Sequence, residues 1–121
     1  MIGEKIQTAL EAVIPNTYVA IADEGVETPF CIHSERQVPI RLKDGVIGYT
    51  YECEVMIIDD SPDNVETLKK SVISALEALE GSSDDDYKIT SVDYTGDEPG
   101  FDKESKLFST ILLFNIDVFN N

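Results

Sequence analysis

The sequence has no tryptophan, one histidine and two cysteines, and basic side chains are scarce. Nine Lys and Arg residues stand against 24 Asp and Glu residues, which gives a formal net charge of −15. A surface this acidic repels phosphate backbones and anionic lipids, so specific nucleic-acid binding and membrane attachment are disfavoured. Long hydrophobic runs are also missing. Runs such as residues 111–114 have the length of a strand and fall far short of the roughly 20 residues that span a bilayer.

The few histidine and cysteine residues restrict the possible chemistry. His33 lies in a strand-like segment without a motif that supplies a catalytic partner, so we predict a structural role for it. Cys31 and Cys53 lie within apolar segments, which favours buried, reduced thiols, and with one histidine they make no zinc site. No phosphate-binding loop, nucleophile elbow or His-Glu-x-x-His motif occurs. The sequence therefore predicts a protein that is not an enzyme and holds no cofactor.

Acidic clusters are the other candidates for a binding site. Residues 59–63 and 93–102 supply oxygen ligands, but neither segment has the spacing of the calcium loop with its central Gly and terminal Glu. We therefore predict no metal site. The acidic clusters are expected in solvent-exposed loops, at residues 59–60, 84–86 and 97–102.

The length of 121 residues and the 42% hydrophobic content suit one domain, residues 1–121, with its own core. No internal repeat or long linker divides the chain. Residues 1–5 lack the basic and apolar stretches of a signal peptide, so the chain is expected to work in the cytoplasm, where it is made.

Helical spacing of apolar residues predicts helices at residues 2–13 and 62–80. The second helix has the stronger signals, because Ser61 suits its N-cap and Gly81 suits its end. One face of it carries a continuous apolar stripe, which indicates packing against a core.

Strands are favoured in five segments, separated by turn signals. The expected order α-β-β-β-α-β-β predicts an α+β fold, an antiparallel sheet of four or five strands with two helices packed on one face. Asp44-Gly45 predicts a hairpin turn, and loops are expected at Asp23-Glu24-Gly25 and at residues 96–104. The predicted strands are residues 17–22, 30–42 with an interruption at Pro39, 46–59, 87–95 and 106–119.

A sheet with helices on one side leaves its other face in need of cover. Ile58, Ile111 and Leu113 are expected on that uncovered face, as candidates for contact with a neighbouring subunit. Tyr49 and Tyr51 share a face with the core residues of their strand. They are interpreted either as core packing or as part of an oligomer interface, where Tyr is enriched.

The order of these segments is similar to that of a known family. A short helix is followed by a proline-led strand at residues 28–33, then by a long strand at residues 49–59 that runs through an acidic turn into the helix at 64–79. A hairpin ends the chain, with its last strand at residues 108–118. This layout resembles the tail-completion proteins of long-tailed bacteriophages and prophages, which are relatives of the tail terminators. The resemblance covers nearly the whole chain.

The resemblance implies a structural protein of the virion tail, made in the host cytoplasm. Such proteins form a homo-oligomeric ring, commonly a hexamer, at the head-proximal end of the tail tube and join the tube to the neck. The implied partners are tail-tube and neck or connector proteins, with DNA passing through the ring and no membrane. From the residues alone, the alternative is a cytoplasmic, non-enzymatic binding or regulatory module that uses the open face of the sheet.

Overall fold

The expected order of two helices and five strands is confirmed in the computed structural model, which describes residues 2–22 and 25–121. Asp23 and Glu24 of the loop expected there lie outside the described part of the chain. Within that part, no helix has both the length and the apolar character needed to cross a membrane. The elements are α1 (Ile2–Glu11), β1 (Thr17–Val19), β2 (Phe30–Leu42), β3 (Gly45–Asp59), α2 (Pro62–Glu77), β4 (Tyr87–Asp102) and β5 (Leu107–Asn120).

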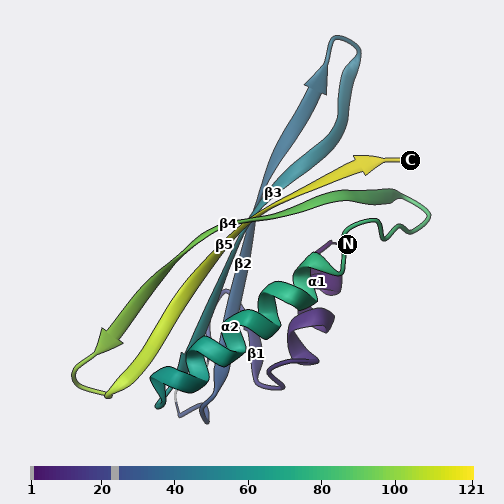
Figure 1. The fold of residues 1–121 in the computed structure, drawn as a ribbon. Helices are drawn as coiled ribbons and strands as arrows, with labels where there is room; N and C mark the ends of the chain where they lie inside the picture. The colour runs from purple at the N-terminus through teal and green to yellow at the C-terminus, as the bar shows by residue number, and fades with distance from the viewer. Residues whose placement is uncertain (1, 23–24) are drawn as a thin grey trace.

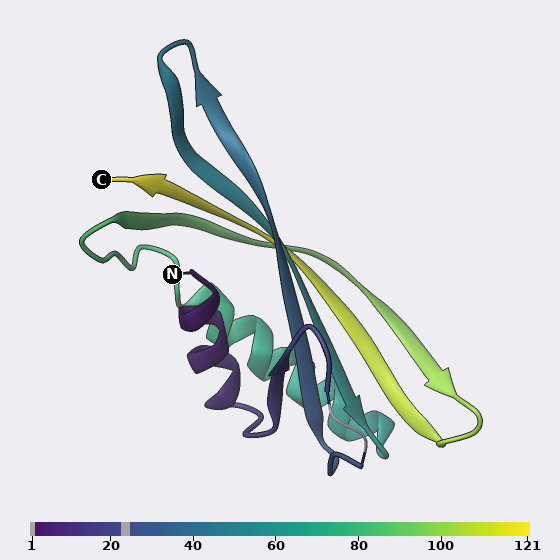
Figure 2. The ribbon, with the colours of Figure 1, turned by 180° about the vertical axis from the view of Figure 1, so that it is seen from behind.

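The strands form one sheet in the order β1-β2-β3-β5-β4, in which the hairpins β2–β3 and β4–β5 join through β3 and β5. Both helices lie on the same face, against one half of the sheet (Figures 1 and 2). The antiparallel prediction is wrong for β1, which pairs with β2 in parallel. The connection between them returns the chain to the end where β1 begins, so that Thr17 lies opposite Cys31.

Two prolines lie inside strands, although Pro39 was expected to interrupt a strand and Pro99 to lie in a loop. Strand β2 runs through Pro39, and β4 continues through Pro99 to Asp102, where a loop was predicted. Proline is tolerated where a strand has no partner on one side. β4 is the edge of the sheet, and β1 covers β2 only opposite residues 31–33, so β2 is also an edge at Pro39.

The predicted ends of three elements also shift. Helix α1 ends at Glu11 rather than at residue 13, and α2 ends at Glu77 rather than at residue 80. In both places the next residues form hydrogen bonds to the carbonyl three residues earlier, as in a 3₁₀ turn. Val13 N–H bonds to Leu10, and Leu79 N–H bonds to Leu76. The first strand stops at Val19 rather than at residue 22, because Ala20 adopts a left-handed φ of 65°.

The start of α2 is fixed by side chains. The Ser61 hydroxyl caps the helix by accepting a hydrogen bond from the Asn64 N–H at 3.2 Å, as predicted for an N-cap. The Asn64 side chain in turn donates to Asp59. Asp59 was expected in a solvent-exposed cluster, but it is only 4% exposed, because it ends β3 beneath the start of α2, where Asn64 satisfies its carboxylate.

The core lies between the helices and the sheet. Phe114 on β5 heads the fully buried side chains by size, and it packs at 5.5 Å between ring centroids from Tyr94 on the neighbouring strand. The other core members alternate along the strands and recur at helical spacing. They include Ile6, Leu10, Cys31, Cys53, Val55, Ile57, Val72, Leu76, Ile89, Leu112 and Ile116.

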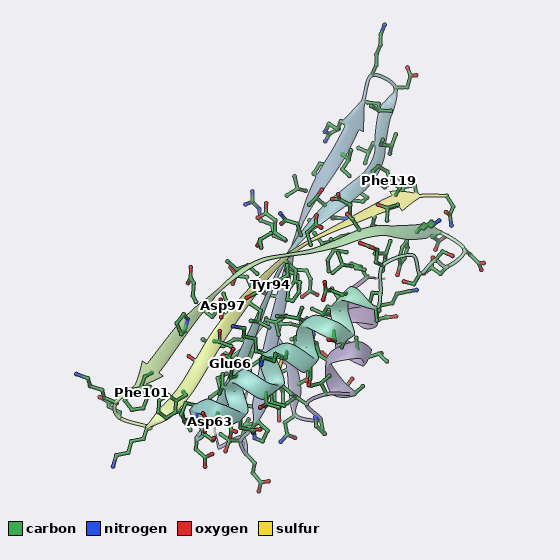
Figure 3. The ribbon with its side chains drawn as sticks, in the orientation of Figure 1. Asp63, Glu66, Tyr94, Asp97, Phe101 and Phe119 are labelled. Carbon is green, nitrogen blue, oxygen red and sulfur yellow. The ribbon has the colours of Figure 1, made fainter. Side chains whose placement is uncertain are left out.

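A salt bridge ties α2 to the edge strand. The Lys69 ammonium on α2 lies 2.9 Å from the Asp97 carboxylate on β4 and 3.3 Å from Glu66. Figure 3 labels Asp97 and Glu66. Asp97 also accepts a hydrogen bond from Thr110 at 3.4 Å. The hydrogen bond from Lys69 is the main reason that the pKa of Asp97 lies below its ordinary value.

Replacing Asp97 with asparagine is expected to lower the free energy of unfolding by about 0.5–1 kcal/mol at pH 7, the size typical of a partly exposed ion pair. Because the folded-state pKa of Asp97 is depressed, its contribution is present above the unfolded pKa, near 4, and is lost as the pH falls through the folded value. Urea unfolding from pH 7 to pH 2.5 should therefore show the two stabilities converging. Glu98→Gln is the matched control, since Glu98 pairs with Ile111 and lies on the other face of the sheet from Asp97. It should change the free energy of unfolding little.

Candidate interaction surfaces

The face of the sheet away from the helices carries a small apolar patch. Ile32, Met56 and Ile111 lie side by side on β2, β3 and β5, and Leu113 follows on β5. All four are half-buried. We call these four residues the open-face patch. Neighbouring apolar side chains on a sheet face that no helix covers are typical of a contact surface.

The residues predicted for an interface are divided between the two faces. Ile111 and Leu113 belong to the open-face patch, while Ile58 is only 7% exposed and offers little contact area. Tyr49 and Tyr51 lie on the helix-covered face, with ring centroids 6.2 Å apart, beside a pocket of about 210 Å³ near Tyr87. The five residues therefore do not form one continuous surface.

Next to the open-face patch lies a hollow of about 570 Å³, which we call the open-face hollow. Two exposed carboxylates on β3, Glu52 and Glu54, line the hollow. Leu113 lines it from β5, the strand between β3 and β4. Arg36 lies across from Glu52 with 3.6 Å between the charged atoms, and their side chains are 78% and 50% exposed. An ion pair this open to water contributes little and is easily exchanged for another. The rest of the lining includes Ser34, Thr95 and Asn115.

The end of the β2–β3 hairpin projects beyond the rest of the sheet (Figures 1 and 2). β5 pairs with β3 only from Gly48 onward, so residues 40–47 have no strand on the β5 side. We call residues 40–47 the arm. Its tip carries Arg41, Leu42 and Lys43, which are all exposed, Leu42 by 62%. With Asp44 as its one acidic residue, the arm is net positive in a chain of formal net charge −15.

The β4–β5 hairpin ends near the start of α2, where Pro62 of the helix and Phe108 of β5 line one pocket. Phe101 near its tip is 51% exposed and packs on Phe108 with ring centroids 4.7 Å apart (Figure 3). The turn carries two lysines, Lys103 and Lys106, among acidic neighbours. This hairpin resembles the arm in shape but lacks a net positive charge.

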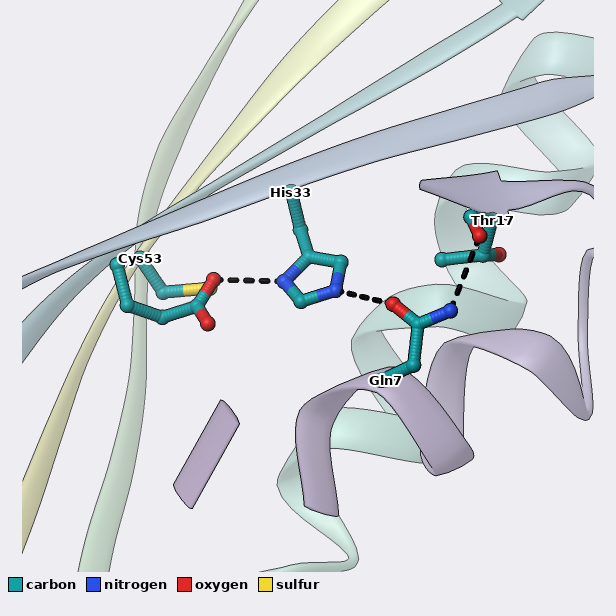
Figure 4. A network of polar contacts seen from close by, with 5 residues as sticks. Gln7, Thr17, His33 and Cys53 are labelled. Atoms are coloured by element: carbon teal, nitrogen blue, oxygen red, sulfur yellow. Dashed lines mark hydrogen bonds and ion pairs between the residues drawn. The ribbon is translucent and has the colours of Figure 1, made fainter. Parts of the chain in front are cut away.

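A polar network lies between α1 and the sheet (Figure 4). His33 is 1% exposed, and its Nδ1 lies 2.7 Å from Glu35 while its Nε2 lies 2.6 Å from the Gln7 side-chain oxygen. The amide nitrogen of Gln7 donates to the Thr17 carbonyl, which fixes the Gln7 oxygen toward the ring. Both ring nitrogens of His33 therefore lie within hydrogen-bond distance of a side-chain oxygen.

The network brings together a thiol, an imidazole and a carboxylate, a set that resembles a nucleophile with its base. The Cys53 thiol lies 3.9 Å from Glu35 and not against the imidazole. Burial, and next the negative charge of Glu35, raise the pKa of the Cys53 thiol well above its ordinary value, so it stays protonated and unreactive. The described residues also contain no group of three or more His, Cys, Asp or Glu side chains placed to hold a metal ion. The arrangement therefore serves packing between α1 and β2.

Both cysteines are free and buried, as predicted. Burial raises the pKa of Cys31 to about 12. The native protein is therefore expected to give no fast reaction with a thiol reagent such as DTNB at pH 8, and two thiols per chain should react in 6 M guanidinium. A fast reaction of either thiol under native conditions would contradict the buried placement.

Sequence reasoning missed two of these features. Glu35 is two residues from His33, a spacing that places both side chains on one face of a strand, but Gln7 approaches only through tertiary packing. The arm had a signal in the sequence, because Arg41 and Lys43 flank Leu42 at the Asp44-Gly45 turn. Of the turns of the two described hairpins, β2–β3 and β4–β5, it is the one where basic residues outnumber acidic ones.

No protein-family model matches the chain, and no curated protein matches it. Among solved structures, the fold is similar to that of a chain in a structure described as the virion of a native gene transfer agent (GTA) particle. The TM-score is 0.65 at 15% sequence identity, and the match covers 93% of this chain and 84% of that chain. At this identity the likeness shows a shared fold.

Proposed function

We propose that this chain is a structural protein of a phage-type virion, with the role of a tail-completion or tail-terminator protein. The observation that carries the proposal is the fold shared with a chain of the gene transfer agent virion over 93% of this sequence. The order of elements that resembles tail-completion proteins supports the same role. In this role the chain forms a ring at the head-proximal end of the tail tube and joins it to the neck.

The surfaces suit assembly rather than catalysis. A closed ring needs two different surfaces that match each other on every subunit. The open face and the projecting hairpins supply such surfaces, while the Cys53 thiol close to Glu35 is buried and protonated. The charge of −15 suits a ring through which DNA passes, because an acidic lumen does not hold the duplex by its phosphates.

Deleting the gene from its phage or prophage tests the role. Electron microscopy of the lysate should show heads and tails that are not joined, and expression of the chain from a plasmid should restore complete particles. Purified particles should also contain the chain at a few copies each by quantitative mass spectrometry. Complete particles from the deletion strain would refute the proposed function.

A further inference from the structure

We propose that the arm of one copy binds the open-face hollow of a second copy of this chain. The inference rests on the proposed function, since it names the two surfaces that meet between neighbouring subunits of the ring. It joins the net positive arm, residues 40–47, to the acidic hollow around Glu52 and Glu54.

The two surfaces match in the order of their groups. The arm tip presents an exposed apolar side chain, Leu42, between the cations Arg41 and Lys43. The hollow presents Leu113 beside the carboxylates Glu52 and Glu54, which lie on one face of β3 about 7 Å apart. Leu42 against Leu113 removes apolar surface from water, while the cations meet the carboxylates.

The arm cannot reach the hollow of its own chain. Arm and hollow share strand β3, and Gly48 at the base of the arm is hydrogen-bonded into the sheet opposite Phe119. A Cβ atom at residue 48 would lie 2.2 Å from the Val118 carbonyl oxygen, so the strands are in close contact here and leave no hinge for the arm to fold back. The partner is therefore another molecule.

A second copy fits the charges better than an unrelated acidic protein does. The same chain that carries the positive arm supplies the carboxylates of the hollow, in a fixed ratio of one arm to one hollow. Because arm and hollow are different surfaces, the contact is heterologous and can close into a ring. The one cation already in the hollow, Arg36, is 78% exposed in its pair with Glu52 and does not block the site.

Charge reversal tests the contact by sedimentation velocity of the full chain, across a concentration series from about 1 μM to 1 mM, chosen to cover weak as well as tight association. The wild type is expected to self-associate, and less so in 0.5 M NaCl. The variant Arg41→Glu/Lys43→Glu should raise the dissociation constant at least about tenfold, as should Glu52→Lys/Glu54→Lys. The matched control is Lys103→Glu/Lys106→Glu, which reverses two cations at the tip of the other hairpin and should leave association unchanged.

Mixing the two reversed variants gives the sharpest result. Each arm then finds a hollow of opposite charge on the other variant, so association is expected to return to within a few-fold of the wild type. A Leu42→Cys chain and a Leu113→Cys chain should also be joined by a short bismaleimide linker only when both are present. Circular dichroism of each variant confirms that it is folded.

Three results would overturn the proposal: a wild type that stays monomeric up to 1 mM, unchanged association of the arm variant, or a mixture that does not recover. The gene-deletion experiment measures whether complete particles form, and its result does not depend on what the arm binds. Separated heads and tails together with arm-independent association would leave the function standing and refute the arm contact. Complete particles from the deletion strain would refute the function whatever the arm binds, and an arm that binds only a tail-tube protein would appear as a monomeric wild type.

Discussion

Replacing His33 with leucine is expected to lower the free energy of unfolding by about 3–5 kcal/mol, because it leaves the largely buried Glu35 carboxylate without its closest partner. The Glu35 side chain is 11% exposed, and His33 is its contact at 2.7 Å. The Gln7 oxygen, 2.6 Å from the ring, loses this contact as well. Urea unfolding followed by circular dichroism measures the loss at a protein concentration below self-association.

The double variant His33→Leu/Glu35→Leu is expected to be more stable than His33→Leu alone. Removing both partners of a buried pair removes the cost of the unpaired charge, whereas removing one partner exposes it. Arg36→Leu is the matched control, since Arg36 lies on the same strand as His33 but on the opposite face, and its ion pair with Glu52 joins side chains that are 78% and 50% exposed. It should change stability by less than about 1 kcal/mol. A loss below about 1 kcal/mol for His33→Leu would mean that the network does not hold α1 to the sheet.

The parts of the fold that follow from local pattern could be predicted from the sequence. The apolar stripe and caps of α2 gave its start at Pro62, and the Asp44-Gly45 turn gave the β2–β3 hairpin. Both signals act between residues close in the chain, so propensity and periodicity decide them. The two helices on one face then follow from the order of elements.

The parts that depend on distant partners could not be predicted. Pro99 and Gly100 indicate a loop by local rules, yet β4 runs through them because β5 supplies the hydrogen bonds and the other side of β4 is free. The parallel pairing of β1 depends on where the following loop returns the chain. The residues expected at one interface lie on two faces of the sheet. Side chains alternate along β3, so Tyr51 and Ile58 point to opposite faces.

Replacing Phe114 with alanine is expected to cost about 3–5 kcal/mol of unfolding free energy, among the largest effects of any single truncation in this chain. Phe114 is 1% exposed and lies on β5, between β3 and β4, where it packs against Tyr94. Alanine leaves a cavity at the point where both hairpins join. Phe114→Leu should recover much of the loss, because it refills most of the volume.

Phe101→Ala is the matched control on the neighbouring strand, at a residue that is 51% exposed, and about 1 kcal/mol is expected for its ring contact with Phe108. Comparing the stability of Phe114→Ala with that of Phe101→Ala separates the contribution of the core from that of the outer surfaces of the sheet. If the core only holds the hairpins in place, folded Phe114→Ala should still associate through its arm, with a dissociation constant within a few-fold of the wild type. Arg41→Glu/Lys43→Glu should show the reverse, with unchanged stability and weakened association. If both variants lost stability and association together, the arm would be part of the folding unit rather than a separate contact surface.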